Sequence, residues 1–231
     1  MSTITIDTGD GAMNAYLALP PGGTGPGIVL IQEIFGVNQV MRDLADQIAS
    51  HGYVVACPDL FWRIQPGIDI SDKTEAEWAR AFDLFKMFHV EHGVRDLRAT
   101  LAALRGHPAV DHKKVGAVGY CLGGKLAYLM AAHTDVDCAV GYYGVGLQDM
   151  LAEASQIRKP LMLHIAGQDS FTPPEAQAKI HEALDKHTHV TIHDFPSNEH
   201  AFARVGGAHY DAAEALIANG LTHDFFKRHL G

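Results

Sequence analysis

The chain has 231 residues, of which 47% are hydrophobic and 19% charged, with a formal net charge of −9 and an isoelectric point near 5.9. This composition is typical of a folded protein with a hydrophobic core and excludes an intrinsically disordered chain. No basic stripe is available to neutralise phosphates, so nucleic acid is excluded as a partner.

Location and cofactors are constrained by what the sequence lacks. The first seven residues contain neither the charged nor the apolar part of a signal peptide, and no run approaches the roughly 18 apolar residues of a membrane span. The three cysteines, Cys57, Cys121 and Cys138, have no CxxC spacing, so we expect a cytoplasmic protein without disulfides or a membrane partner. No HExxH motif occurs, and His187 and His189 have no third ligand nearby. We therefore expect no metal and no cofactor.

Short apolar runs alternate with longer amphipathic ones, which predicts a mostly parallel sheet with helices on both faces. In chain order the expected strands are 13–19, 28–32, 53–56, 114–119, 138–143, 160–165 and 189–194. The expected helices are 40–50, 74–88, 94–104, 123–132, 173–186 and 208–229. Because no repeat and no linker interrupts this order, we expect one α/β domain over residues 1–231.

Glycines on both sides of Cys121 form the sharpest local signal. The run Gly119-Tyr120-Cys121-Leu122-Gly123 places cysteine in the serine position of the G-x-S-x-G nucleophile elbow, between an expected strand and an expected helix. In such a turn the nucleophile has a strained backbone, and the glycines remove side chains that would collide. The helix N-terminus favours thiolate over thiol. The alternative is a small core cysteine in a tight turn.

Candidate partners of Cys121 follow it in the order nucleophile, acid, histidine that α/β-hydrolases share. Asp169 and His200 each follow an expected strand, and the carboxyl ends of strands are where open sheets build their sites. The sequence therefore predicts a Cys121, His200 and Asp169 triad. Asp169 could instead be a turn or helix-capping residue, and His200 an exposed loop histidine. Asp194 competes for the acid role, although a surface carboxylate is the better interpretation of it.

Six segments of the chain, taken in order, resemble the dienelactone hydrolase (carboxymethylenebutenolidase) family over nearly the whole length. They are residues 32–38 (QEIFGVN), 57–60 (CPDL), 115–124 (VGAVGYCLGG), 139–146 (AVGYYGVG), 167–169 (GQD) and 200–204 (HAFAR). The resemblance implies a single-domain α/β-hydrolase fold and hydrolysis of an enol-lactone ring to an open dicarboxylic acid. It also implies that neither a metal nor an organic cofactor is used.

The resemblance also implies roles for individual residues. Cys121 would be the nucleophile, His200 the base and later the acid, and Asp169 the group that orients His200. Glu33 would pair with the resting thiol and take its proton when substrate arrives. Such a gate is chemically reasonable, because like charges make a carboxylate a poor permanent partner for a thiolate. The alternative for Glu33 is a buried or capped carboxylate after a strand.

The implied reaction cycle needs an oxyanion site and a water molecule. Backbone N–H groups of Leu122 and Ile34 would bind the oxyanion. Cys121 would be acylated by the ester carbonyl, and water activated at His200 would hydrolyse the thioester.

The residues expected to bind the substrate carboxylate depart from the family pattern. Family members use two arginines and a serine that follows the catalytic histidine. Arg204 matches one arginine, but Ala201 stands at the serine position and Trp78 at the position of the other arginine. Arg80, two residues on, could serve only if the helix shifted its register.

We therefore expect a pocket that depends less on a substrate carboxylate. Its possible wall residues are Trp78, Phe82, Phe35 and Tyr143, each of which could instead be an ordinary core aromatic. Three functions stay open: a lactone hydrolase, a broader carboxylesterase or thioesterase, and a non-catalytic small-molecule-binding domain. The expected partner is a small ester or lactone, and the chain is expected to be a monomer or a homodimer.

Overall fold

The computed structural model describes residues 2–231, and the chain divides into two compact units, residues 1–116 and 117–231. The expectation of one domain over residues 1–231 stays a prediction. Strand β5 (Val110–Tyr120) begins in the first unit and ends in the second.

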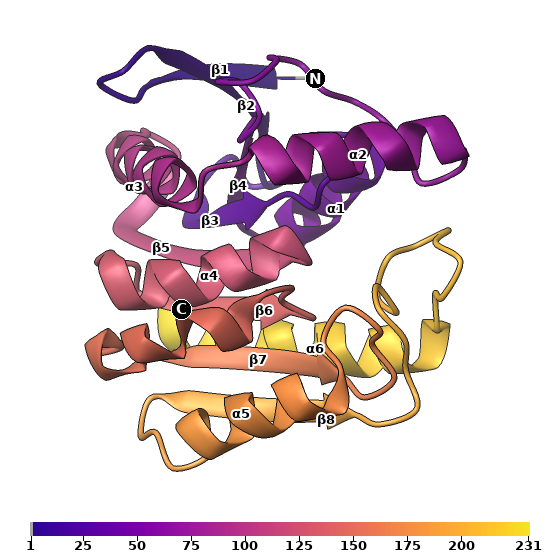
Figure 1. Ribbon diagram of the computed structural model, residues 1–231. Helices are drawn as coiled ribbons and strands as arrows, with labels where there is room; N and C mark the ends of the chain where they lie inside the picture. The colour runs from indigo at the N-terminus through magenta and orange to yellow at the C-terminus, as the bar shows by residue number, and fades with distance from the viewer. Residues whose placement is uncertain (1) are drawn as a thin grey trace. The chain divides into compact units, whose positions relative to one another are not determined.

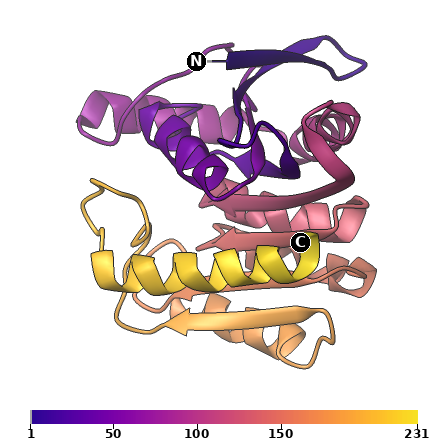
Figure 2. The same ribbon diagram turned by 180° about the vertical axis from the view of Figure 1, so that it is seen from behind.

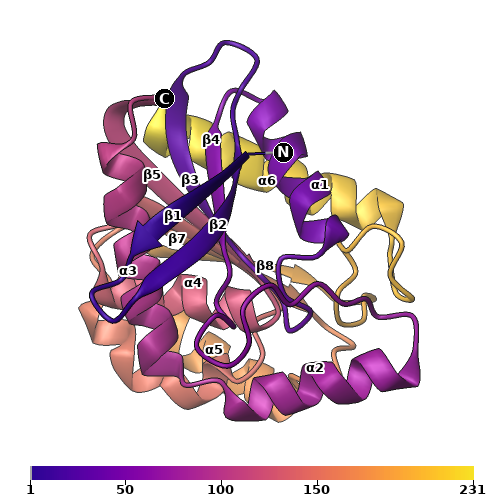
Figure 3. The same ribbon diagram turned by 90° about the horizontal axis from the view of Figure 1, so that it is seen from above.

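The first unit combines a short sheet with helices on both faces. Its strands are β1 (Ser2–Asp7), β2 (Ala12–Ala18), β3 (Gly25–Ile31) and β4 (Val54–Pro58), in the order β1-β2-β4-β3 followed by β5. Its helices are α1 (Gln39–Ser50), α2 (Glu75–Met87) and α3 (Val90–Gly106). Strands β3 and β4 are parallel, whereas β1 and β2 form an antiparallel pair that Figure 3 shows from above. Helix α1 covers one face and α3 the other (Figures 1 and 2).

The second unit contains the parallel strands that follow β5. Strands β6 (Cys138–Tyr142), β7 (Leu161–Ala166) and β8 (Val190–Phe195) follow β5 in the order β5-β6-β7-β8. Its helices are α4 (Leu122–His133), the 3-10 helix η1 (Leu147–Gln156), α5 (Pro174–Leu184) and α6 (Ala212–Leu230). Every residue of β6 and β7 is buried, as in a sheet covered on both faces. Helices α4 and α5 lie on one side and α6 on the other (Figures 1 and 2).

These elements confirm the expected fold class, an α/β fold with a mostly parallel sheet and helices on both faces. Two elements escaped the sequence analysis, β1 and η1. Strand β1 gains its partners only in the antiparallel pair with β2, where Ser2 to Asp7 face Leu17 to Ala12. Short irregular helices such as η1 have no strong periodicity to reveal them.

Helix starts follow the capping rules. Thr74 accepts a hydrogen bond from the Glu77 N–H and donates its hydroxyl to the Glu77 carboxylate, which fixes the start of α2. Asp211 caps α6, so that helix begins later than the expected residue 208. Asp169 does not cap α5, whose N-cap is Pro173 without a side-chain hydrogen bond, and the capping alternative for Asp169 is therefore wrong.

Candidate active site

Cys121 occupies the sharp turn between β5 and α4. Its backbone has φ 57° and ψ −114°, a conformation that a non-glycine residue adopts only at a cost. Glycines make this turn sterically possible. A Cβ at position 119 would lie 2.0 Å from the Gly123 carbonyl oxygen, and one at position 124 would lie 2.3 Å from the Tyr142 carbonyl oxygen. The first of these requirements was predictable from the sequence, but the second was not, because Tyr142 approaches only in the folded sheet.

Backbone hydrogen bonds hold the turn against β6 and the loop after it. The Cys121 N–H donates to the Tyr142 carbonyl at 3.1 Å, and the Val145 N–H donates to the Cys121 carbonyl at 3.3 Å. Tyr142 is itself anchored, because its hydroxyl lies 2.6 Å from Thr222 Oγ1 and donates to Asn219 Oδ1 at 3.0 Å on α6. The strained residue is therefore held in place by its neighbours.

Asp169 follows β7 and its carboxylate is engaged at both oxygens. Oδ1 accepts a hydrogen bond from the Phe171 N–H at 2.8 Å, and Oδ2 lies 2.7 Å from His200 Nδ1. The side chain is almost completely buried, with a relative exposure of 1%. Two short hydrogen bonds to one buried carboxylate leave it a single orientation, and that orientation faces His200.

His200 lies in the loop after β8, and its ring is packed on two sides. The Tyr143 and Phe171 rings contact it edge-on, with ring centroids at 5.1 and 4.9 Å. The following residue, Ala201, has φ 63°, so the backbone next to the histidine is also in the left-handed region. In the second unit the positive-φ residues other than glycine are Cys121, Tyr143 and Ala201, and all three belong to this site. Strain concentrated at one place is a feature of functional sites.

Electrostatics links Cys121, His200 and Asp169. Burial alone would lower the pKa of His200, but the charge of Cys121 and the hydrogen bonds to Asp169 and Cys121 outweigh it and raise that pKa from 6.5 to about 10. A negative charge on the Cys121 sulfur would therefore be matched by an imidazolium at His200. Such a pair is a reactive nucleophile with its proton carrier already beside it.

Lys125 is a further charged group that the sequence analysis missed. It lies one turn after Cys121 on α4, and its exposure is only 7%. Burial lowers the pKa of its ammonium group, while the charges of Cys121 and Asp149 act in the opposite direction. Spacing i, i+4 from the nucleophile was the available signal.

Other residues expected in the site also lie in the second unit. Leu122 is the first residue of α4, where the N–H groups have no acceptor within the helix. Arg204 follows His200 in the same loop and packs on Gly207, where a Cβ would lie 3.0 Å from Arg204 Nε. Phe171, exposed by 41% and packed on His200, was not expected from the sequence, although it lies only two residues after Asp169.

The remaining expected residues lie in the first unit. Glu33 and Ile34 follow β3 and are buried, with exposures of 3% and 5%. The Gln32 side chain fixes this segment, because it donates to the Glu33 carbonyl at 3.2 Å and accepts from the Leu60 N–H at 3.0 Å.

The expected aromatic wall residues of the first unit contact one another. The Phe35 and Trp78 ring centroids are 5.0 Å apart, and those of Trp78 and Phe82 are 5.5 Å apart.

Arg80 donates from its guanidinium to the Gln65 side chain at 2.6 Å, and α2 keeps a regular helix from Glu75 to Met87. No shift of register brings Arg80 to the position of Trp78.

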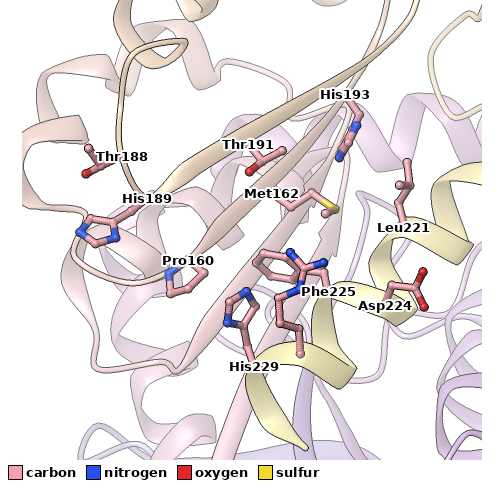
Figure 4. A pocket seen from close by; sticks show the side chains of 11 residues that line it. Pro160, Met162, Thr188, His189, Thr191, His193, Leu221, Asp224, Phe225 and His229 are labelled. Atoms are coloured by element: carbon pink, nitrogen blue, oxygen red, sulfur yellow. The ribbon is translucent and has the colours of Figure 1, made fainter.

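A cavity of about 440 Å³ lies elsewhere in the second unit (Figure 4). Its lining includes Pro160 and His189, which precede β7 and β8, together with Phe225 near the end of α6. Asp169 and His200 follow the opposite ends of these two parallel strands. None of the three candidate triad residues lines this cavity, so it is separate from the chemistry described above.

Residues 2–231 contain neither a candidate metal-binding cluster nor a candidate membrane-spanning helix. Within that part of the chain, no three His, Cys, Asp or Glu side chains converge in a way that could hold a metal ion. Over the same residues, none of the helices combines the length and the apolar character needed to cross a bilayer. Cys57 and Cys138 are buried and have free thiols.

Comparison with known proteins gives a consistent result. The profile of the Dienelactone hydrolase family matches residues 13–230. The chain is 39% identical to the carboxymethylenebutenolidase of Pseudomonas sp. strain P51, over 97% of this chain and 94% of the relative. It is also 39% identical to the carboxymethylenebutenolidase of Pseudomonas putida, over 96% and 94%. The solved dienelactone hydrolase of Anabaena variabilis has the same fold, with a TM-score of 0.73 and 18% identity over 100% of this chain and 98% of that one.

Proposed function

Because the chain belongs to the dienelactone hydrolase family and is therefore an enzyme that acts on ester bonds, we propose that it opens a small enol-lactone with Cys121 as nucleophile. The observation that carries this proposal is the 2.7 Å contact between His200 Nδ1 and Asp169 Oδ2, in a site where His200 is coupled to Cys121. The relatives named carboxymethylenebutenolidase support the substrate class.

The first half of the proposed cycle opens the lactone ring. The Cys121 sulfur attacks the ester carbonyl carbon, and a carbon–sulfur bond forms as the carbonyl oxygen becomes an oxyanion. When the tetrahedral intermediate collapses, the bond between the carbonyl carbon and the ring oxygen breaks. The ring oxygen leaves as an enolate, which takes the proton of the His200 imidazolium, and the opened chain stays attached to Cys121 as a thioester.

The second half depends on a change in His200. While Cys121 is charged, it holds the pKa of His200 near 10. Acylation removes the charge of the sulfur and its hydrogen bond to His200. The pKa-lowering effect of burial is then opposed only by Asp169, so the pKa of His200 falls. Neutral His200 then accepts a proton from water, the hydroxide attacks the thioester carbonyl, and the carbon–sulfur bond breaks.

Backbone and carboxylate groups complete the proposal. The Leu122 N–H at the first turn of α4 would donate to the oxyanion, with the Ile34 N–H as the second donor. One donor of this kind typically contributes about 3 kcal/mol of transition-state stabilisation. Glu33 would take the proton of the resting thiol when substrate arrives, as the family resemblance implies. Glu33 is buried in the segment after β3.

Hydrolysis of a dienelactone and of p-nitrophenyl acetate by wild type and Cys121→Ser tests the proposal. We expect rapid dienelactone turnover that falls at least about a hundredfold in the variant, because a serine hydroxyl is far less ionised than a cysteine. Cys138→Ala is the matched control, since it removes a buried sulfur from β6 and should leave turnover within about threefold. Equal turnover by wild type and Cys121→Ser would contradict the proposed nucleophile.

A broader carboxylesterase or thioesterase is the second candidate function, and two positions favour it. Ala201 cannot donate the hydrogen bond that a serine would give to a substrate carboxylate. Trp78 stands where the family resemblance places an arginine, and Arg80 is bound to Gln65. Turnover of p-nitrophenyl acetate alone, lost in Cys121→Ser, would keep the nucleophile and assign the chain to this second class.

The relaxed-specificity proposal predicts a small preference for charged substrates. We expect kcat/KM for a lactone with a free carboxylate to exceed that of its neutral methyl ester by less than about a hundredfold, since only Arg204 is available in the second unit as a family-like partner. Arg204→Gln should reduce this preference and leave the neutral lactone unaffected. A preference for the acid far above a hundredfold would show that a second anion-binding group is present.

A further inference from the structure

Gln177 lies on α5 beside the loop that carries Asp169. Its side-chain amide donates to three backbone carbonyls, those of Ala166 at 3.2 Å, Gly167 at 3.4 Å and Thr172 at 2.7 Å. Ala166 is the last residue of β7, and Thr172 precedes the first turn of α5. The single amide group therefore joins the two ends of the loop.

The donor count of Gln177 matches these acceptors. A primary amide has two hydrogens. One is sufficient for the short bond to the Thr172 carbonyl, and the other can be shared between the neighbouring carbonyls of Ala166 and Gly167. Carbonyls of a loop need such partners when they turn away from the sheet. The loop also contains two bonds of its own, from the Asp169 N–H to the Ala166 carbonyl and from the Thr172 N–H to the Asp169 carbonyl.

The orientation of the Asp169 carboxylate depends on this loop backbone. One oxygen accepts from the Phe171 N–H, and the other faces His200 at 2.7 Å. A displacement of residues 170–172 would move the Phe171 N–H and with it the carboxylate. Catalytic geometry is sensitive to such movements, since misplacement by about 1 Å can cost about a hundredfold in rate.

We propose that Gln177 is a positioning residue for catalysis. It holds the loop of residues 167–173, here called the acid loop, so that Asp169 keeps His200 in its productive orientation. The inference rests on the proposed function of the Cys121, His200 and Asp169 site. Gln177 acts through Asp169, because its amide hydrogens are directed at carbonyls of the loop that carries Asp169. Its amide holds the acid loop by hydrogen bonds, just as the backbone hydrogen bonds of Tyr142 and Val145 hold the turn that carries Cys121.

Three variants at position 177 test the proposal. Gln177→Met keeps the length of the side chain but removes both donor hydrogens, and we expect kcat to fall about ten- to a hundredfold while KM changes by less than about twofold. Gln177→Glu places a carboxylate against three carbonyl oxygens and should be at least as damaging. Gln177→Lys restores hydrogen-bond donors at the same place and should recover a substantial part of kcat.

Two further measurements distinguish the positioning role of Gln177 from a purely structural one. The charged groups facing His200 are Cys121 and Asp169, and loss of the Asp169 contact lowers the pKa of His200. In a plot of kcat against pH, the fall on the acidic side reports protonation of His200. This fall should therefore move to lower pH in Gln177→Met. The downfield proton resonance of the His200 Nδ1–H, which its bond to a carboxylate produces, should weaken or disappear. Lower thermal stability alone would change neither readout.

Gln168→Met is the matched control. The Gln168 amide donates to a single carbonyl, that of Pro196, at 3.0 Å on the exposed side of the same loop. We expect its kcat and pH profile to stay close to those of wild type. Unchanged kcat, pH profile and resonance in Gln177→Met, or equal losses in Gln168→Met, would overturn the inference. If Asp169→Asn were also without effect, the proposed mechanism itself would fail, whereas a strong effect of Asp169→Asn would confine the failure to Gln177.

Discussion

His200→Gln is expected to lower kcat/KM by about ten-thousandfold or more, because loss of the histidine from a nucleophile–base pair removes most of the catalysis that the whole unit provides. Glutamine has a similar polarity but can neither give a proton to the leaving enolate nor accept one from water.

His193→Gln is the control for this prediction. His193 lies on β8, where its ring stacks on that of His164 at 5.7 Å, and burial lowers its pKa so that it is neutral at pH 7. Its replacement should leave kcat/KM within about threefold of wild type, as for most substitutions away from a site. A His200→Gln variant with a tenth of wild-type activity would exclude His200 as the base.

Asp169→Asn is expected to lower kcat by about a thousand- to ten-thousandfold, with a smaller effect on KM. The asparagine amide would donate to His200 Nδ1, which places the ring proton on the nitrogen that should accept one. Asp169 also raises the pKa of His200, so the acid limb of the kcat profile of the residual activity should move to lower pH.

Asp194→Asn is the matched control for the acid. Asp194 was the competing candidate in the sequence, and its Oδ1 lies 3.1 Å from His181 Nε2 on α5. The carboxylate is exposed by 49%. We expect no more than about a threefold change in kcat, because exposed ion pairs contribute little. A larger loss in Asp194→Asn than in Asp169→Asn would reverse the assignment of the acid.

Together these two comparisons test whether the three groups act as a unit. If they do, the double variant His200→Gln and Asp169→Asn should be hardly slower than His200→Gln alone, because Asp169 acts only through the histidine. Additive losses would indicate a separate role for Asp169.

Features with a local cause were predictable from the sequence. The spacing of apolar residues located most strands and helices, because the pattern of buried positions repeats within a few residues along each element. The strained turn at Cys121 was predictable for the same reason, since Gly119 must accommodate a carbonyl only four residues away, that of Gly123. The expected strands placed Asp169 and His200 after strands of a parallel sheet, and the family segments implied their roles.

The tertiary structure decided which side chains meet. Asp169 faces His200 because β7 and β8 are parallel and in register, which brings the loops at their carboxyl ends together, whereas Asp194 on β8 faces His181 on α5. Gly124 meets the Tyr142 carbonyl, and Gln177 reaches three carbonyls of the acid loop, only after helices pack on that sheet. Periodicity describes how each segment buries its own surface, whereas these contacts join segments far apart in the chain. The sequence by itself therefore determined the elements and the candidate nucleophile, and strand pairing determined the partners that surround it.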